Sequence, residues 1–137
     1  MNYTLASGQT SFGRILVVDS SEVIRLTVRL ILSRKGYQVV EATCAEAAIT
    51  LLERGDAIDT ILCDTEIKDT DGSEAIPLLC KRFPAIPLII IGEPDPVAEA
   101  LAKYRPADHL LKPLAERRML EVVPAAVRLH QLRAKQA

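Results

Sequence analysis

Three short apolar runs, each followed by a charged residue, constrain the fold of this chain more than any other feature. The runs are residues 15–18 before Asp19, residues 58–63 before Asp64 and residues 108–111 before Lys112. Nearly continuous apolar runs of this length are typical of strands that are buried on both faces of a parallel sheet covered by helices. Ligands bind such sheets beyond the carboxyl ends of the strands, so we expect the two carboxylates and the ammonium group to converge on one crevice.

The composition is that of a single globular domain. The chain has 137 residues, of which 49% are apolar, and a formal net charge of -1. A charge so close to neutral does not favour nucleic-acid binding, and no stretch approaches the roughly 20 apolar residues that span a membrane. We therefore expect no direct contact with nucleic acid and no membrane insertion.

The N-terminal segment and the cysteines indicate a cytoplasmic protein. Residues 1–13 lack the basic start and the apolar core of a signal peptide, and we interpret them as a flexible leader. The three cysteines, Cys44, Cys63 and Cys80, are odd in number and have no metal-binding spacing. Reduced thiols of this kind are typical of the cytoplasm.

Turn and cap signals divide the chain into alternating strands and helices. We expect strands at residues 14–18, 37–41, 58–63, 87–91 and 107–111. We expect helices from Ser20 or Ser21 to Gly36, at residues 45–54, 73–83 and 97–104, and from residue 113 onward. With right-handed crossovers, this alternation predicts an α/β fold, a flavodoxin-like doubly wound (βα)5 parallel sheet with strand order 2-1-3-4-5.

Glycines and prolines mark the loops between these elements. Residues 65–72 form a polar loop that ends in the turn signal of Asp71 and Gly72. Pro94 and Pro96 predict a loop at residues 92–96 and a short or irregular fourth helix after it. Pro124 predicts a kink in the last helix.

The chain resembles the receiver domain of two-component response regulators. The matching segments, in order along the chain, are residues 15–19, 36–37, 62–64, 71–72, 87–91 and 112–113. They define a receiver domain at residues 14–127, between the leader and a helical extension at residues 128–137. The resemblance implies that a sensor histidine kinase or a phosphotransfer protein passes a phosphoryl group to Asp64.

The resemblance also implies roles for the residues around Asp64. It implies a Mg²⁺ ion held by Asp19, Asp64 and the backbone carbonyl of Glu66, and it gives Lys112 the task of neutralising the phosphoryl group. It further implies a cis peptide bond between Lys112 and Pro113. These roles agree with the chemistry, because phosphoryl transfer depends on charge neutralisation and positioning, and Mg²⁺ prefers oxygen ligands.

Several residues depart from the receiver pattern. Ser20 stands where the family has a second acidic residue, which removes one carboxylate from the metal site; its hydroxyl could contribute there, or it could simply cap the following helix. Gly92 stands where a Thr or Ser hydroxyl would bind the phosphoryl group. Glu93 replaces a small residue, and it could repel the phosphoryl group, pair with Lys112 or face solvent.

Three further positions bear on the reaction and the switch. His109 replaces the aromatic residue that usually changes rotamer, and it is either a pH-responsive group or a partly exposed polar residue. Thr65 and Glu66 flank the reaction site, and Thr65 is a candidate for contact with the phosphoryl group or for the switch. The side chain of Glu66 can alter the attack of water on an acyl phosphate.

The last helix points to partners. Leu129 and Leu132, with basic residues between them, continue an amphipathic pattern beyond residue 127. This extension could pair with a second copy through the face formed by the fourth helix, the fifth strand and the last helix, lead to an output domain, or fray.

Two functions therefore remain open. In the first, Asp64 accepts a phosphoryl group in a Mg²⁺-dependent reaction and the domain changes its partner contacts; such a domain is a signalling phosphoacceptor and not an enzyme. In the second, the chain is a degenerate receiver that binds partners without phosphorylation. A flavin or nucleotide site is disfavoured, because no glycine-rich loop follows the first strand.

Overall fold

The computed structural model describes residues 3–4, 10–68, 72 and 74–136. The elements in chain order are β1 (Tyr3–Thr4), β2 (Thr10–Ser11), β3 (Gly13–Val18), α1 (Glu22–Arg34), β4 (Tyr37–Ala42), α2 (Ala45–Glu53), β5 (Thr60–Asp64), α3 (Ala75–Arg82), β6 (Leu88–Gly92), α4 (Pro94–Tyr104), β7 (Asp108–Leu111) and α5 (Glu116–Gln136). The strands β1 and β2 pair antiparallel in a small separate sheet.

The centre of the molecule is a parallel sheet of five strands in the order β4-β3-β5-β6-β7. Counted along the chain, this is the order 2-1-3-4-5, so the flavodoxin-like fold predicted from the sequence is confirmed. Neighbours β3 and β5 lie where the strand order reverses, and their carboxyl ends point to the same edge of the sheet.

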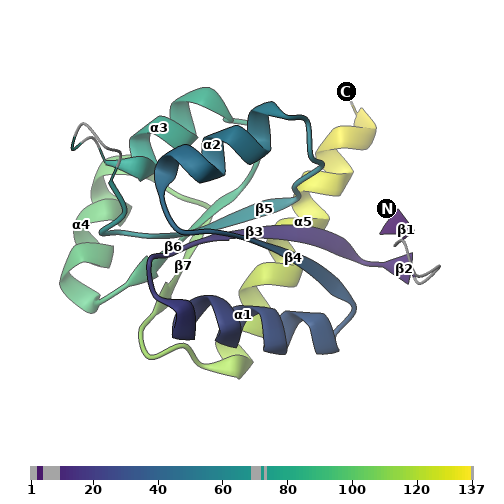
Figure 1. Cartoon of the computed structure of the whole chain (residues 1–137), viewed down its shortest axis with the longest axis horizontal. Helices are drawn as coiled ribbons and strands as arrows, with labels where there is room; N and C mark the ends of the chain where they lie inside the picture. Colours follow the sequence, from purple (N-terminus) through teal and green to yellow (C-terminus); the bar gives the residue numbers. More distant parts are fainter. Residues whose placement is uncertain (1–2, 5–9, 69–71, 73, 137) are drawn as a thin grey trace.

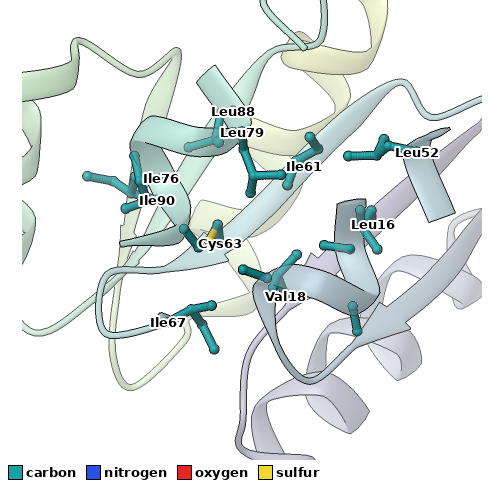
Figure 2. Packing of buried hydrophobic residues seen from close by; sticks show 14 of the residues in the cluster. Leu16, Val18, Leu52, Ile61, Cys63, Ile67, Ile76, Leu79, Leu88 and Ile90 are labelled. Atoms are coloured by element: carbon teal, nitrogen blue, oxygen red, sulfur yellow. The ribbon is translucent and has the colours of Figure 1, made fainter. Parts of the chain in front are cut away.

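Alternating strand residues build a hydrophobic core on each face of the sheet. Figure 1 shows α2 and α3 on one side of the sheet and α1 on the other. On the first side, strand residues such as Ile61 and Cys63 pack with α2, α3 and α4. Figure 2 shows these two residues among Leu52 of α2 and Ile76 and Leu79 of α3. On the second side, Leu62 and its neighbours pack with α1 and α5. Because both faces are covered, the strands are apolar almost throughout.

Helix α1 begins and ends at residues suited to those positions. The hydroxyl of Ser21 accepts a hydrogen bond from the backbone N–H of Ile24 at 3.2 Å, which makes Ser21 the N-cap. Gly36 follows the helix with a φ of 91°, a left-handed conformation that favours glycine. The alternative that Ser20 caps this helix is therefore wrong; Ser20 is exposed and precedes the cap.

Two predictions about this region are wrong: the loop at residues 92–96 and the irregular fourth helix. Strand β6 extends to Gly92, and α4 is a regular helix of 11 residues that begins at Pro94. Pro94 and Pro96 lie in its first turn, where backbone N–H groups have no partner within the helix, so the missing protons break no hydrogen bond. The backbone N–H of Val97 donates the first such bond, to the carbonyl of Glu93 at 3.0 Å.

The remaining element boundaries differ slightly from expectation. Helix α3 begins at Ala75 rather than at residue 73, which lies outside the described residues, as does Asp71 of the predicted turn. Gly72 itself has a φ of 86°, as a turn glycine does. Helix α5 begins at Glu116 and contains Pro124.

Both expected domain boundaries are crossed by contacts. At the first, Gly13 already belongs to β3, and the backbone N–H of Phe12 donates to the carbonyl of Gly36 at 2.9 Å. At the second, α5 continues without interruption past residue 127, and the side-chain amide of Gln131 donates to the carbonyl of Phe12 at 3.1 Å. Within the described part of the chain, no helix is both long enough and apolar enough to cross a membrane.

Candidate functional site

The sheet brings three charged side chains to one edge. Asp64 is the last residue of β5, and Asp19 follows β3 directly. Val18 is in register with Cys63, so the two aspartates stand side by side on neighbouring strands. Lys112 follows β7, and its backbone N–H donates to the carbonyl of Gly92 at 2.9 Å, which sets the lysine beside the end of β6.

Lys112 joins the two carboxylates. Its Nζ lies 3.1 Å from Oδ1 of Asp64 and 3.2 Å from Oδ2 of Asp19. Asp19 is 1% exposed and Asp64 is 5% exposed, so these charges interact in a medium much less polarisable than water. The peptide bond between Lys112 and Pro113 is cis, as the resemblance implies.

The ionisation of Asp64 and Lys112 reflects burial and this pairing. Burial raises the pKa of Asp64, and the nearby charge of Asp19 raises it further, against the opposing effect of the Lys112 ammonium. Burial alone would lower the pKa of Lys112, but the hydrogen bond to Asp64 and the two carboxylate charges outweigh it, and that pKa is raised. The site therefore holds an excess of negative charge that a cation would relieve.

The two oxygens of Asp19 have different surroundings. Oδ1 accepts a hydrogen bond from the backbone N–H of Ser21 at 2.8 Å, which fixes the carboxylate against the start of α1. Oδ2 is buried and forms an ion pair with the Lys112 ammonium at 3.2 Å, but within the described part of the chain it accepts no hydrogen bond of good geometry. A buried carboxylate oxygen without a hydrogen bond next to a second carboxylate is a suitable ligand for a hard cation.

The donor set fits Mg²⁺ and no softer metal. Asp19 and Asp64 offer carboxylate oxygens, and Glu66, in the turn after β5, offers a backbone carbonyl. Within residues 10–68, 72 and 74–136, no group of three or more Asp, Glu, His or Cys side chains is placed to hold a metal. A Mg²⁺ ion here would keep several waters, which this ion does readily.

The side chains of Ser20 and Glu93 are exposed, and that of His109 is partly exposed. Glu93 is the N-cap residue of α4 and its side chain faces solvent, while its effect on a phosphoryl group stays a prediction. Nδ1 of His109 lies 3.5 Å from the carboxylate of Asp108 in the middle of β7. Among the described residues, the ion pairs of Lys112 are with Asp19 and Asp64 and not with Glu93.

Thr65 and Gly92 form a contact that sequence reasoning missed. The backbone N–H of Thr65 donates to the carbonyl of Ile91 at 2.9 Å, which sets Thr65 against the end of β6. A Cβ atom added to Gly92 would lie 2.7 Å from Oγ1 of Thr65, closer than such atoms approach in proteins. The sequence shows that position 92 is a glycine and position 65 a threonine, but only the strand register shows that these two residues are neighbours.

Comparison with known proteins agrees with this geometry. Residues 15–124 match the response regulator receiver domain family. The response regulator protein FleR of Pseudomonas aeruginosa is 28% identical over 113 residues, which cover 80% of this chain and 24% of FleR. The alginate biosynthesis transcriptional regulatory protein AlgB of Pseudomonas putida is 30% identical, over 93% of this chain and 30% of AlgB. The chain thus spans about a quarter to a third of these relatives.

Solved structures agree in fold. The signal receiver domain of an HD domain-containing protein from Pseudomonas fluorescens superposes with a TM-score of 0.80 at 21% identity, over 97% of this chain and all of that chain (100%). Full-length FixJ from B. japonicum superposes with a TM-score of 0.76 at 25% identity, over 91% of this chain and 62% of FixJ.

Proposed function

This chain belongs to the response regulator receiver family, and we propose that it accepts a phosphoryl group on Asp64 and changes its partner contacts in response. A receiver domain is a signalling phosphoacceptor rather than an enzyme, and membership implies a histidine kinase as partner. The observation that carries the proposal is the buried cluster in which Lys112 Nζ lies 3.1 Å from Asp64 and 3.2 Å from Asp19.

The chain's own residues supply a nucleophile and a positive charge. A carboxylate oxygen of Asp64 attacks the phosphorus, and the bond from phosphorus to the donor atom breaks as the new P–O bond forms. The donor atom, a nitrogen of a kinase histidine or an oxygen of a small acyl phosphate, leaves with the electron pair. Lys112 neutralises negative charge on the phosphoryl oxygens, which is the main requirement of phosphoryl transfer.

Receiver domains typically depend on Mg²⁺, and the oxygens present here fit that ion. Asp19, Asp64 and the backbone carbonyl of Glu66 would hold it, and Ser20 is near enough in sequence to contribute through a water. When bound, the ion adds positive charge beside the transferring phosphoryl group. The N–H of Ser21 fixes one oxygen of Asp19, so the carboxylate is held with its other oxygen, Oδ2, beside Lys112 at the candidate site.

Phosphorylation would redirect the contacts of Lys112. In the structure, its ammonium joins Asp64 to Asp19, and a phosphoryl group on Asp64 adds three acceptor oxygens that compete for it. Such switching shifts the population between an unphosphorylated and a phosphorylated conformation. Without a hydroxyl at Gly92, the phosphorylated conformation has fewer contacts, so the free-energy difference between the two conformations is smaller but both still exist.

The proposed surface for a second copy is the face of α4, β7 and α5, on which Leu111 is exposed. The proposed compartment is the cytoplasm, which suits three free thiols.

A second function is favoured by different residues. Ser20 stands where a second carboxylate would help to hold a metal, Gly92 has no hydroxyl, and the exposed Glu93 adds a negative charge directly after Gly92. A domain with these features could bind its partners without phosphorylation, and that interaction module is the alternative.

Intact mass spectrometry separates the two. The protein is incubated with acetyl phosphate, with Mg²⁺ or with EDTA, beside Asp64→Asn and beside Asp95→Asn, which alters an exposed carboxylate on α4. We expect one phosphoryl adduct that needs Mg²⁺, disappears in Asp64→Asn and persists in Asp95→Asn. No adduct on the unmodified protein at any Mg²⁺ concentration would reject the phosphoacceptor role and leave the interaction module.

A further inference from the structure

Two buried polar side-chain atoms have no hydrogen-bond partner in the described part of the chain, and both are at the candidate site. One is Oδ2 of Asp19, which the metal site explains; the other is the hydroxyl oxygen of Thr65. A buried hydroxyl without a partner is costly, and proteins keep such groups mainly where a ligand completes them. Thr65 directly follows Asp64, so its hydroxyl belongs to the same strand end as the proposed phosphoacceptor.

From this we propose that Thr65 is a phosphoryl-contacting residue, whose hydroxyl binds the phosphoryl group on Asp64 in place of a side chain at position 92. The inference rests on the proposed phosphorylation of Asp64. It gives the unpartnered hydroxyl its acceptor, because a phosphoryl group brings three strongly accepting oxygens to the adjacent residue.

The packing shows that positions 65 and 92 share the space of one side chain. A Cβ on Gly92 would lie 2.7 Å from Oγ1 and 3.3 Å from Cγ2 of Thr65, and 3.3 Å from Cγ2 of Val97 on the other side. Both Oγ1 and Cγ2 of Thr65 therefore face Gly92. A rotation about χ1 that exchanges these two atoms would leave little space for a Cβ atom at position 92.

The backbone of Thr65 cannot retreat to make room. Its N–H donates to the carbonyl of Ile91 at 2.9 Å and continues the pairing of β5 with β6, in which Asp64 is in register with Ile91. The hydroxyl therefore comes from Thr65, directly after β5, whereas Gly92 at the end of β6 has no side chain to offer one. A receiver that lacks the hydroxyl at the end of β6 has, in this chain, another one within the same volume.

The competing explanation is that Thr65 only fills space. Valine has nearly the same shape as threonine without the hydroxyl, and serine keeps the hydroxyl without the methyl group, so Thr65→Val and Thr65→Ser separate the two roles. The double variant Thr65→Ala with Gly92→Thr moves the hydroxyl to the end of β6 and also relieves the close contact.

The experiment measures the rate of phosphorylation by acetyl phosphate and the lifetime of the adduct, together with thermal stability without phosphodonor. We expect Thr65→Val to slow phosphorylation roughly tenfold, the effect of losing one hydrogen bond to a charged group. The same variant should be no less stable than the parent, because it removes an unpartnered buried hydroxyl. Thr65→Ser should keep most of the rate, and the double variant should recover it.

Unchanged rate and lifetime in Thr65→Val, with the parent protein phosphorylated, would overturn this inference and leave the proposed function intact. Equal slowing in Thr65→Val and Thr65→Ser would also overturn it, since packing would then explain the loss. If the parent protein forms no adduct, the proposed function fails and this inference fails with it. Gly92→Ala alone should slow phosphorylation, because its Cβ would displace the Thr65 hydroxyl.

Discussion

The imidazole of His130 and the carboxylate of Asp59 meet at 2.9 Å, at the end of the sheet opposite to Asp64. Asp59 is 1% exposed, and its second oxygen accepts a hydrogen bond from the backbone N–H of Arg14 at 3.0 Å. One carboxylate thus ties the start of β3, the start of β5 and the late part of α5 together. The segment after residue 127 is anchored to the domain by this contact.

The first prediction concerns that anchor. Asp59→Ala should lower the free energy of unfolding by about 2 kcal/mol, because it leaves the backbone N–H of Arg14 without its side-chain acceptor. His130→Ala should cost about 1 kcal/mol, since it removes one hydrogen bond at a partly exposed position. Urea denaturation measures both, with Asp56→Ala as the control, whose exposed ion pair with Arg54 is worth little. Equal losses for Asp59→Ala and the control would contradict the anchoring role.

The second prediction concerns the positive charge at the site. Lys112→Met leaves Asp19 and Asp64 side by side in a buried place without a counter-ion. We expect a loss of about 2 kcal/mol in the free energy of unfolding at pH 7.5, a smaller loss at pH 5 as Asp64, whose pKa burial raises, takes up a proton, and partial recovery with Mg²⁺. The control is Lys103→Met, which removes an exposed ion pair with Glu99. A loss independent of both pH and Mg²⁺ would show that only the packing of the lysine stem matters.

The third prediction concerns the pH dependence of stability. Burial raises the pKa of Asp64, so this group stabilises the folded state at low pH, and its contribution is lost as the pH rises through the folded-state pKa. Asp64→Asn is neutral throughout, so without Mg²⁺ it should be about 1 kcal/mol more stable than the parent at pH 7.5. The difference should shrink toward pH 4. Urea denaturation across this range tests the sign, and a parent protein more stable than the variant at pH 7.5 would refute it.

The fourth prediction concerns the missing acidic residue. Ser20→Asp adds a carboxylate next to Asp19 and should tighten Mg²⁺ binding at least about fivefold, since a charge pair 4 Å apart is worth about 1 kcal/mol even in water. Because the chain contains no tryptophan, calorimetry or NMR titration is the suitable measurement. Ser33→Asp, at the far end of α1, adds the same charge away from the site. If both variants bind Mg²⁺ alike, the gain reflects net charge and not coordination.

The fold and the charged cluster could be predicted because both follow from local patterns. Apolar runs without alternation indicate strands buried on both faces, and the topology rules then bring Asp19 and Asp64 to the same edge. The fourth helix was mispredicted because a proline breaks a helix only beyond the first turn, and the sequence does not show where Pro94 and Pro96 fall relative to that turn. The sequence could not distinguish Ser21 from Ser20 as the N-cap, because the two serines are adjacent and the cap depends on where the first helical turn begins.

The contacts that could not be predicted join residues distant in the sequence. Nothing local to Phe12 indicates that its N–H pairs with Gly36 or that its carbonyl accepts from Gln131. Likewise, Thr65 and Gly92 share a space because of the register of β5 against β6. The hydrophobic pattern determines which face of the sheet a residue takes, but not which residue of the neighbouring strand it lies beside.

Strand β5 serves two cores and the candidate site at once. Ile61 and Cys63 face one core, Leu62 faces the other, and Asp64 ends the strand at the crevice. Inserting or deleting one residue here would exchange the two faces and also carry the carboxylate out of reach of Lys112. In evolution, this strand can therefore exchange single residues more easily than it can change its length, because a change of length would disrupt both cores together with the cluster of Asp19, Asp64 and Lys112.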